Sequence, residues 1–201
     1  MEVLVPFAAD APKTRLEDAL GTDERAAFAR AMLLDVCEAV DAAGGDPTVL
    51  STAPVEVPWP VVVDERPLTE AVDAHVDPPT AVVMADLALA TPAAVARLLD
   101  ADGDIVLAPG LGGGTNAIVV RCDGFAFDYH GVSIRDHRER AREAGATLAT
   151  VDSFRLAVDV DEARDLVELL LHGDGRSRTW LLEAGFEVAA ADGRVVATRD
   201  E

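Results

Sequence analysis

The stretch Ala108-Pro109-Gly110-Leu111-Gly112-Gly113-Gly114-Thr115-Asn116-Ala117 lies between two apolar runs, Ile105-Val106-Leu107 and Ile118-Val119-Val120. Such runs predict buried strands, so the glycines lie in the loop between two strands. Glycine adopts positive φ and lets backbone N–H groups approach a ligand closely. Thr115 and Asn116 add a hydroxyl and an amide that bind oxygen atoms. The segment favours a loop that holds a phosphorylated or carboxylated small molecule, with a flexible turn as the alternative. No Gly-Lys-Ser/Thr follows, so it is not a P-loop.

One apolar run marks the centre of the predicted sheet. Thr80-Ala81-Val82-Val83-Met84-Ala85-Asp86 is unbroken until its final acid, which is typical of a strand covered on both faces. Shorter apolar runs predict further strands at residues 3–7, 48–52, 61–64, 147–151 and 155–158. Helical patterns alternate with these runs, and the alternation predicts an α/β fold with one domain over residues 1–201.

Capping residues place the predicted helices. One helix is expected from the N-cap Thr22 to Gly44-Gly45, and another from the N-cap Thr91, with Pro92 at its first position. Further helical segments are predicted at residues 66–72, 134–144, 162–171 and 180–182.

The last part of the chain is predicted to extend the domain. Residues 186–198 form two strand-like runs that turn at Asp192-Gly193. Together with the short helix before them, they are expected to form a C-terminal extension over about residues 175–201.

The composition is strongly acidic. The 201 residues include 37 Asp and Glu but only 17 Lys and Arg, and the formal net charge is −20. Nucleic acid is excluded as a partner, because neutralising its phosphates needs a basic surface. An acid-rich chain with a single lysine and few aromatic residues is typical of adaptation to high salt, where screening weakens self-repulsion. We therefore expect a halophilic archaeal source.

Membrane segments and metal-binding cysteines are not expected. No apolar run approaches the roughly 18 residues that a membrane span needs, and Met1-Glu2 leads directly into Val3-Leu4-Val5 without a signal peptide. We expect a soluble, cytoplasmic protein with no membrane partner. Cys37 and Cys122 lie far apart without further ligand residues beside them, so buried reduced thiols are expected and a zinc site is not.

Two cations follow the first predicted strand. Lys13, the only lysine, and Arg15 lie in the loop after Val3-Leu4-Val5-Pro6-Phe7. Ligands of doubly wound α/β proteins bind beyond the carboxyl ends of the strands, so both side chains are placed to bind a triphosphate. Two ordinary surface cations are the alternative.

Three aspartates and a histidine complete the candidate residues. Asp86 ends the central strand, where a carboxylate can hold a divalent cation on a ligand's phosphates; a turn or capping role is the alternative. In Asp159-Val160-Asp161, one aspartate is expected to cap the next helix while the other points into the site. His137 lies one helical turn after Ser133, in a polar helix that is expected to leave it on the surface.

Several motifs together resemble one family. They are Lys13-Thr14-Arg15-Leu16, Met84-Ala85-Asp86-Leu87, residues 109–117, residues 129–137 with Ser133, and Asp159-Val160-Asp161. The pattern resembles the 2-phospho-L-lactate guanylyltransferases over roughly residues 3–171, and Gly112 to Asn116 is its most specific part. The resemblance implies a Rossmann-like nucleotidyltransferase fold of the nucleotide-diphospho-sugar transferase type, a three-layer sandwich with a mostly parallel central sheet.

The resemblance also implies a reaction, in the biosynthesis of coenzyme F-420. GTP and (2S)-2-phospholactate give lactyl-2-diphospho-5′-guanosine and pyrophosphate, by attack of a phosphate oxygen on the α-phosphorus. Positioning and charge neutralisation do most of the work in such a transfer, with Mg²⁺ as the implied cofactor. A homodimer is suggested by the family alone.

The same resemblance implies roles for individual residues. The catalytic residues would be Lys13, Arg15, Asp86 and Asp159. The nucleotide would contact Pro6, Phe7, Lys13, Arg15 and Asp86. Mg²⁺ would be held by Asp86 and Asp159, with Asp161 as a further ligand or a helix cap. The acceptor acid would be bound by Gly112, Gly113, Gly114, Thr115, Asn116, Gly131 and Ser133.

The chain departs from the family pattern at three positions. Ala88 stands where a proline usually follows Ala-Asp-Leu, and Thr69 replaces an asparagine that is common in the helix after the third strand. His130 stands where a glycine is usual before the serine, and the neighbouring Gly131 is expected to take over its role.

Other functions stay open at this stage. The acceptor could be phosphoenolpyruvate or another small phosphorylated acid. A molybdopterin nucleotidyltransferase is a more distant alternative, against which the lack of glycine between Ala8 and Pro12 counts. A non-catalytic nucleotide-binding module is a third reading, and the retention of both Asp86 and Asp159 argues against it. No residue that reads the base is identifiable from the sequence.

Overall fold

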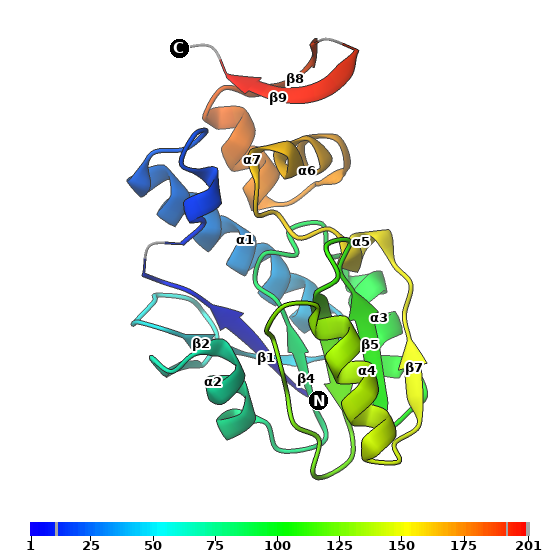
Figure 1. Ribbon diagram of the computed structural model, residues 1–201. Coiled ribbons are helices and arrows are strands. Elements are labelled where there is room, and N and C mark those ends of the chain that lie inside the picture. The colour runs from blue at the N-terminus through cyan, green and yellow to red at the C-terminus, as the bar shows by residue number, and fades with distance from the viewer. Residues whose placement is uncertain (11, 192, 200–201) are drawn as a thin grey trace.

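The computed structural model describes residues 1–10, 12–191 and 193–199. A seven-stranded sheet has the strand order β3-β2-β1-β4-β6-β5-β7 (Figure 1). Its strands are β1 (Glu2–Phe7), β2 (Asp46–Ser51), β3 (Val61–Val63), β4 (Thr80–Val83), β5 (Ile105–Pro109), β6 (Thr115–Val120) and β7 (Leu148–Thr150). Only β6 runs antiparallel to its two neighbours, and the other pairs are parallel. The predicted α/β fold with a mostly parallel sheet is confirmed.

Helices cover both faces of this sheet, which makes the predicted three layers. On one face lie α1 (Thr22–Ala42) and α3 (Pro92–Asp100), and on the other lie α2 (Leu68–His75) and α4 (Ser133–Glu143) (Figure 1). The alternation of side chains along β1 serves both layers, because Val3 and Val5 belong to one buried cluster and Leu4 to the other. None of the described helices combines the length and apolar character that crossing a membrane requires.

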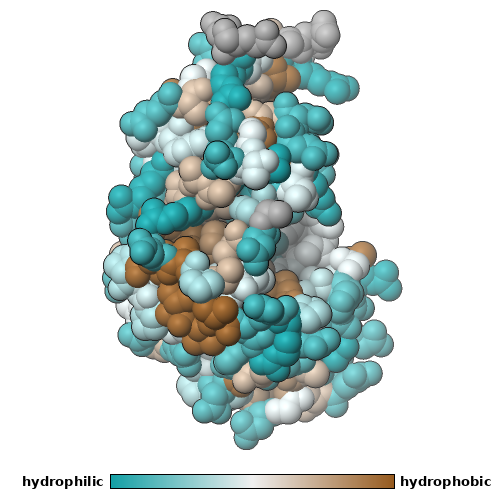
Figure 2. Space-filling view, turned by 90° about the vertical axis from the view of Figure 1, so that its left-hand side faces the viewer, coloured by the Kyte–Doolittle hydropathy of each residue, from teal (hydrophilic) through white to brown (hydrophobic). Residues whose placement is uncertain are grey.

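The surface agrees with the acidic composition. Figure 2 views the molecule from the left-hand side of Figure 1, and hydrophilic residues cover most of this face. Hydrophobic residues gather in its lower half. Cys37 is fully buried, as expected, whereas Cys122 is only half-buried, and both thiols are free.

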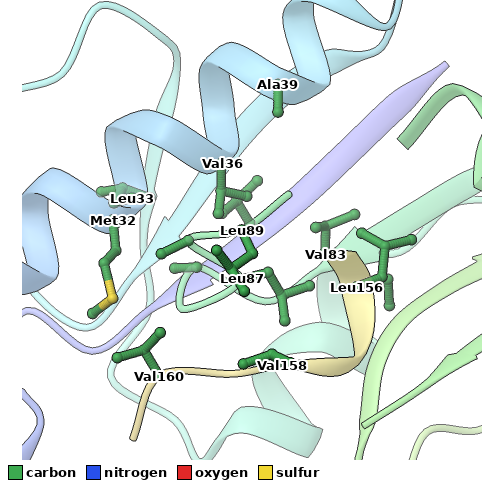
Figure 3. Close-up of a cluster of buried hydrophobic side chains, with 14 of the residues drawn as sticks. Met32, Leu33, Val36, Ala39, Val83, Leu87, Leu89, Leu156, Val158 and Val160 are labelled. Atoms are coloured by element: carbon green, nitrogen blue, oxygen red, sulfur yellow. The ribbon is translucent and has the colours of Figure 1, made fainter. Parts of the chain in front are cut away.

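The core between α1 and the sheet fixes the segment that carries two candidate aspartates. In Figure 3, α1 side chains face the turn after β4 and residues 156–160. The labelled side chains are Met32, Leu33, Val36, Ala39, Val83, Leu87, Leu89, Leu156, Val158 and Val160. Burying each of the larger ones stabilises the fold by about 1.5–3 kcal/mol. Because alternate residues 156, 158 and 160 are buried, Asp159 and Asp161 project to the opposite side.

Three local predictions were wrong. Residues 155–158 are not a strand, since Phe154–Ala157 forms the short helix α5. The N-cap of α1 is Gly21, whose N–H donates to Glu24 Oε2 at 2.9 Å, and not Thr22. The central strand ends at Val83, so Asp86 lies in the turn that follows β4. The N-cap Thr91 is confirmed, because its hydroxyl accepts from Ala94 N at 3.3 Å.

The end of the chain packs on α1 and then leaves the main sheet. After the 3₁₀ turn η2 (Ala163–Asp165) come α6 (Leu166–His172), α7 (Arg176–Glu183) and the hairpin of β8 (Phe186–Ala191) and β9 (Arg194–Arg199). The Asp35 carboxylate of α1 accepts from Arg176 N at 2.7 Å and Ser177 N at 2.9 Å, so it caps α7 from another helix. The short helix and the hairpin were predicted; Asp192, at the predicted turn, lies outside the described residues.

Candidate active site

The candidate site lies where the strand order reverses. The chain passes from β1 outward to β2 and β3, then returns to β4 on the other side of β1. Open α/β sheets form a crevice beyond the carboxyl ends of the strands at such a point. The loop after β1 carries Lys13, and the turn after β4 carries Asp86. The topology therefore brings together two residues that are 73 positions apart.

Lys13 links the turn after β4 to the segment that carries Asp161. Its ammonium donates to Asp86 Oδ2 at 2.8 Å and to Asp161 Oδ1 at 2.5 Å. The side chain is 12% exposed. Burial lowers the pKa of Lys13, but the two carboxylates outweigh it and raise the pKa above its ordinary value. The residue precedes the 3₁₀ turn η1 (Thr14–Leu16) with φ 56°, a left-handed conformation that is uncommon outside glycine and is found at functional sites.

Asp86 has one oxygen on Lys13 and one without a protein partner. Its Oδ1 is buried and accepts no hydrogen bond from the described residues. Its backbone carbonyl accepts from Val160 N at 3.1 Å, which fixes the Asp159–Asp161 segment against the turn after β4. A buried carboxylate oxygen without a donor is costly unless a ligand or a cation satisfies it.

Asp159 is held beside Asp86 by the glycine-rich hairpin. Asn116, at the start of β6, donates from Nδ2 to Asp159 Oδ1 at 3.2 Å and to Leu156 O at 3.0 Å. Burial raises the pKa of Asp159, and the charge of Asp86 raises it further. The Nδ2 group of Asn116 is therefore engaged within the protein, where it helps to position the Asp159 carboxylate.

Asp161 points into the site, but neither Asp159 nor Asp161 caps the next helix, so that expectation was wrong. The N-cap of η2 is Glu162, whose N–H donates to Asp165 Oδ2 at 2.8 Å, and Asp161 N donates to the same oxygen at 3.1 Å. Arg15 reaches Asp161 Oδ2 at 3.4 Å, and its side chain is 69% exposed. Arg15, a predicted nucleotide contact, is therefore largely exposed and is not among the residues that line the cavity described below.

The glycine-rich loop is the tight end of the β5–β6 hairpin. Gly110 N donates to Gly114 O at 2.9 Å, and Gly113 N donates to Gly110 O at 3.1 Å. Gly113 has φ 85°, which only glycine adopts readily. Within the described residues, the N–H groups of Gly112 and Gly114 have no hydrogen-bond acceptor. Leu111 N donates to Ala157 O at 3.0 Å and anchors the loop beside the aspartate segment.

A buried network supports this loop from below. Ser133 Oγ accepts from Thr115 N at 2.9 Å, and His137 Nδ1 lies 2.8 Å from Thr115 Oγ1. His137 Nε2 accepts from Asp128 N at 2.9 Å, so Nδ1 carries the proton. Burial lowers the pKa of His137 to about 4. The expectation that His137 lies on the surface was wrong, since its exposed fraction is 0%.

The departures from the family pattern have simple local roles. Thr69 Oγ1 accepts from Tyr129 N at 3.1 Å and ties α2 to the segment before α4. His130 is 81% exposed and hydrogen-bonds Asp128, while Gly131 has φ 57°. Ala88 is buried in the core below the turn after β4.

The crevice contains a cavity of about 450 Å³. Its lining includes the predicted nucleotide contacts Pro6, Phe7, Lys13 and Asp86, together with Asp161. It also includes residues that sequence reasoning missed as site residues, namely Thr52, Asp64 and Arg66. All three lie just past the ends of β2 and β3, and that position was the signal that could have identified them.

The described residues fit a divalent cation in part. They contain no group of three or more His, Cys, Asp or Glu side chains that could hold a metal. Asp86 nevertheless offers an oxygen without a partner, and Asp159 offers a carboxylate whose pKa is raised by burial and by the charge of Asp86. A cation that takes its other ligands from a bound phosphate and water suits this pair.

The mostly parallel sheet and the crevice beyond its β1 and β4 strands define a doubly wound α/β protein with a site of the kind that binds nucleotides. A crystal structure assigned to the nucleotide-diphospho-sugar transferases, from Desulfovibrio desulfuricans G20, has the same fold with a TM-score of 0.68 and 18% identity, covering 90% of this chain and 94% of that one. The family described as "Guanylyl transferase CofC like" matches residues 1–199, and the chain belongs to it.

Curated relatives extend over the whole chain. A 2-phospho-L-lactate guanylyltransferase of Natronomonas pharaonis is 67% identical over 199 residues, which cover 99% of each chain. A protein of the same name from Haloferax volcanii is 59% identical over 204 residues, covering 100% of this chain and 99% of that one.

Proposed function

We propose that this chain transfers the guanylyl group of GTP to 2-phospho-L-lactate, giving lactyl-2-diphospho-5′-guanosine and pyrophosphate. The observation that carries the proposal is the single ammonium of Lys13 between Asp86 and Asp161, at the switch point of a nucleotidyltransferase sheet. Membership of the guanylyl transferase family and the names of the full-length relatives support the choice of donor and acceptor.

The chemistry asks the protein to position two anions and to offset their charge. An oxygen of the phospholactate phosphate forms a bond to the α-phosphorus of GTP, and the bond from that phosphorus to the β-phosphate oxygen breaks. Pyrophosphate leaves with the electron pair. No general base is required, because the phosphate dianion is already nucleophilic. The transfer therefore depends on orientation and charge neutralisation.

Lys13 and Arg15 are assigned to the triphosphate. Lys13 lines the cavity, whereas Arg15 lies outside the lining residues and reaches them through Asp161, so we assign Lys13 to the inner phosphates and Arg15 to the outer ones. The free N–H groups of Gly112 and Gly114 are assigned to the acceptor, because their hairpin lies against the Asp159 segment. Thr115 and Ser133 are buried and bonded to each other, so we assign them to the support of that loop.

Mg²⁺ is assigned to Asp86 and Asp159. When bound, it would supply positive charge between donor and acceptor phosphates. We assign Asp161 the role of orienting Lys13 and Arg15, since both cations contact it. Its carboxylate orients the two side chains that receive the triphosphate.

The test is a pyrophosphate-release assay in high salt with GTP, Mg²⁺ and 2-phospholactate, with phosphoenolpyruvate as the competing acceptor. We expect Asp86→Asn to lower kcat by at least about 100-fold, the loss typical of a missing electrostatic contact. Asp104→Asn is the matched control, because Asp104 pairs with Thr147 at the opposite edge of the sheet. An Asp86→Asn variant with normal turnover would remove this residue from the site. Absence of pyrophosphate release by the wild-type chain, with GTP still bound, would favour a binding module.

A further inference from the structure

The cavity extends from the phosphate-binding residues to the edge of the sheet. Lys13 and Asp86 follow β1 and β4, whereas Asp64 and Arg66 follow β3. β3 is the edge strand and lies three places from β4 in the sheet, which corresponds to roughly 14 Å at the usual strand spacing. A nucleoside triphosphate with its phosphates at Lys13 would therefore direct its base toward Asp64 and Arg66.

Arg66 is fixed in one orientation by Asp64. Its Nε donates to Asp64 Oδ1 at 2.9 Å and to Oδ2 at 3.1 Å, its Nη2 also contacts Oδ2, and its backbone N donates to Oδ1 at 3.0 Å. His75 of α2 lies with Nε2 2.9 Å from the same Oδ2. A planar guanidinium paired in this way keeps a defined direction for its remaining N–H groups.

Arg66, and not Asp64, is the group that can meet a ligand. Asp64 is 8% exposed and both of its oxygens are already engaged, whereas Arg66 is 48% exposed. The Nη1 atom of Arg66 makes no hydrogen bond to any described residue. The neighbouring cavity wall is apolar, with Pro67, Leu68 and Leu50 suited to contact the faces of a flat ring.

The donor pattern of this group selects among bases. A guanidinium offers only N–H donors. Guanine presents two adjacent acceptors, O6 and N7, on one edge, whereas adenine presents the N6 amino donor beside N7. Two N–H groups of an arginine can donate to both acceptors of guanine, whereas with adenine one of them would face the N6 amino donor.

We propose that Arg66, oriented by Asp64 and His75, is the residue that reads the base, by donating to O6 and N7 of guanine. This inference rests on the proposed use of GTP and adds to it the origin of the guanine preference. The base would lie over the carboxyl ends of β2 and β3, away from the acceptor loop.

The rival role for Arg66 is contact with a phosphate, and the two roles predict different binding patterns. A base-reading arginine affects only nucleotides that carry the O6 and N7 acceptors. A phosphate-binding arginine weakens every nucleotide and inorganic triphosphate by a similar factor. Arg15→Gln is the reference variant for that second pattern.

The experiment is calorimetric titration, in high salt with Mg²⁺ and without acceptor, of GTP, 7-deaza-GTP, ATP and inorganic triphosphate. The wild-type chain should bind GTP about 10–100-fold more tightly than ATP, and 7-deaza-GTP, which lacks N7, at an intermediate level. Arg66→Gln should remove most of the GTP advantage while leaving ATP and triphosphate within about 3-fold. Arg66→Lys keeps the charge but not the fork, so it should lose the preference as well.

The outcomes separate this inference from the proposed function. An equal loss for all four ligands, or an unchanged GTP preference in a folded Arg66→Gln variant, overturns the assignment of Arg66 and leaves the guanylyl transfer intact. A wild-type chain that binds GTP and ATP equally well overturns guanine selectivity itself. Thermal unfolding of each variant shows whether it is folded under the titration conditions.

Discussion

A single ammonium group offsets the charge of two carboxylates in this site. Lys13 contacts Asp86 and Asp161, but the hydrogen bonds that it forms do not include Asp159. The raised pKa of Asp159 shows the consequence, because its ionised form is disfavoured by burial and by Asp86. The arrangement therefore keeps one poorly compensated negative charge, as active sites often do at the expense of stability.

Asp159→Asn should stabilise the protein while abolishing most of its activity. The variant removes the repulsion between the carboxylates of residues 159 and 86 but keeps a side-chain oxygen that can accept a hydrogen bond from Asn116. The folded-state pKa of Asp159 lies above its unfolded value, so ionisation destabilises the fold increasingly as pH rises through the folded pKa. We expect Tm to rise by about 2–4 °C at pH 8, the shift that roughly 1 kcal/mol gives in a protein of this size.

Thermal unfolding at a series of pH values from 8 downward checks this prediction. The gain in Tm should shrink as the pH approaches the folded-state pKa of Asp159, because the wild-type carboxyl is then protonated. A variant that is destabilised throughout the series would show that Asp159 is fully compensated by its neighbours.

The β5–β6 hairpin is the element that joins acceptor binding to the carboxylates. Its loop contacts Ala157 through Leu111, and its first β6 residues contact Ser133 and Asp159. Gly110 allows the close approach of Asn116, since a Cβ there would lie 2.3 Å from Asn116 Oδ1. The loop conformation and the position of Asp159 are thus linked through one asparagine.

Gly113→Ala should raise KM for the acceptor more than KM for GTP. Gly113 has φ 85°, and an added Cβ would lie 3.2 Å from Val132 Cγ1, so alanine would strain the loop by about 1–2 kcal/mol. We expect an increase of about 5–30-fold in the acceptor KM, which steady-state kinetics with each substrate varied in turn would measure.

Gly145→Ala is the matched control for this change. Gly145 also has positive φ, 66°, and an added Cβ there would meet no atom within 4 Å, but it follows the end of α4 that is remote from the loop. Its acceptor KM should change by less than about 3-fold. Equal effects of both substitutions, or a larger effect of Gly113→Ala on GTP, would contradict the assignment of this loop to the acceptor.

Helix α4 supports the hairpin through a histidine that must stay neutral. The pKa of His137 is lowered by burial to about 4, from an ordinary value of 6.5. Protonation therefore favours the unfolded chain, and stability is lost as pH falls from 6.5 toward 4. The loss should reach about 3 kcal/mol, and urea unfolding in high salt at pH 7 and pH 4.5 would measure most of it.

His137→Gln removes the titrating group but keeps an amide that can donate and accept. This variant should lack the His137 contribution to the pH dependence, although its stability at pH 7 is lower. Both proteins share the surface carboxylates, so the titration of these groups cancels when the two unfolding free energies are subtracted at each pH. The same dependence of unfolding free energy on pH in both proteins would show that His137 is not the group responsible.

Sequence patterns predicted the elements well where one local signal was sufficient. Apolar runs located the strands, and Thr91-Pro92 located the start of α3. The segment 155–158 was misread because Leu156, Val158 and Val160 alternate as strand residues do, although α5 forms there. His137 was misread because its helix is polar, although Phe125, Phe127 and Tyr129 of the preceding segment pack against its ring.

The candidate site was predictable to the extent that strand ends define it. Lys13 and Asp86 follow strands, and parallel strands bring their carboxyl ends to one edge. The contact between Lys13 and Asp161 spans 148 positions, and such a long-range pairing has no pattern in the sequence. Arg66 was overlooked because a single arginine in a loop resembles any surface cation until its partner Asp64 is seen.

The whole molecule carries far more acid than its site requires. With a formal net charge of −20, surface carboxylates repel one another. Salt screens this repulsion beyond the Debye length, which is about 10 Å at 0.1 M and 3 Å at 1 M. The contacts of Lys13 are largely shielded from solvent and are screened much less. Salt should therefore stabilise the fold without breaking the ion pairs of Lys13.

We expect Tm to rise steadily between 0.1 M and 2 M KCl. The measurement is thermal unfolding by circular dichroism at constant pH, with potassium glutamate as a second salt. Screening predicts similar gains with both salts at low concentration. A Tm that does not depend on salt would show that the acidic surface contributes little repulsion to the folded state.

The extended segment after α5 has a consequence for how this chain can vary. Its even-numbered residues fill the core, and its odd-numbered aspartates contact Lys13 and Asn116 on the opposite side, so core and site residues alternate one by one. Substitution of one residue therefore disturbs either the core or the site, but not both. Deletion or insertion of a single residue there would reverse the alternation and place both acids in the hydrophobic interior. Evolution can therefore change single side chains of this segment but not its length.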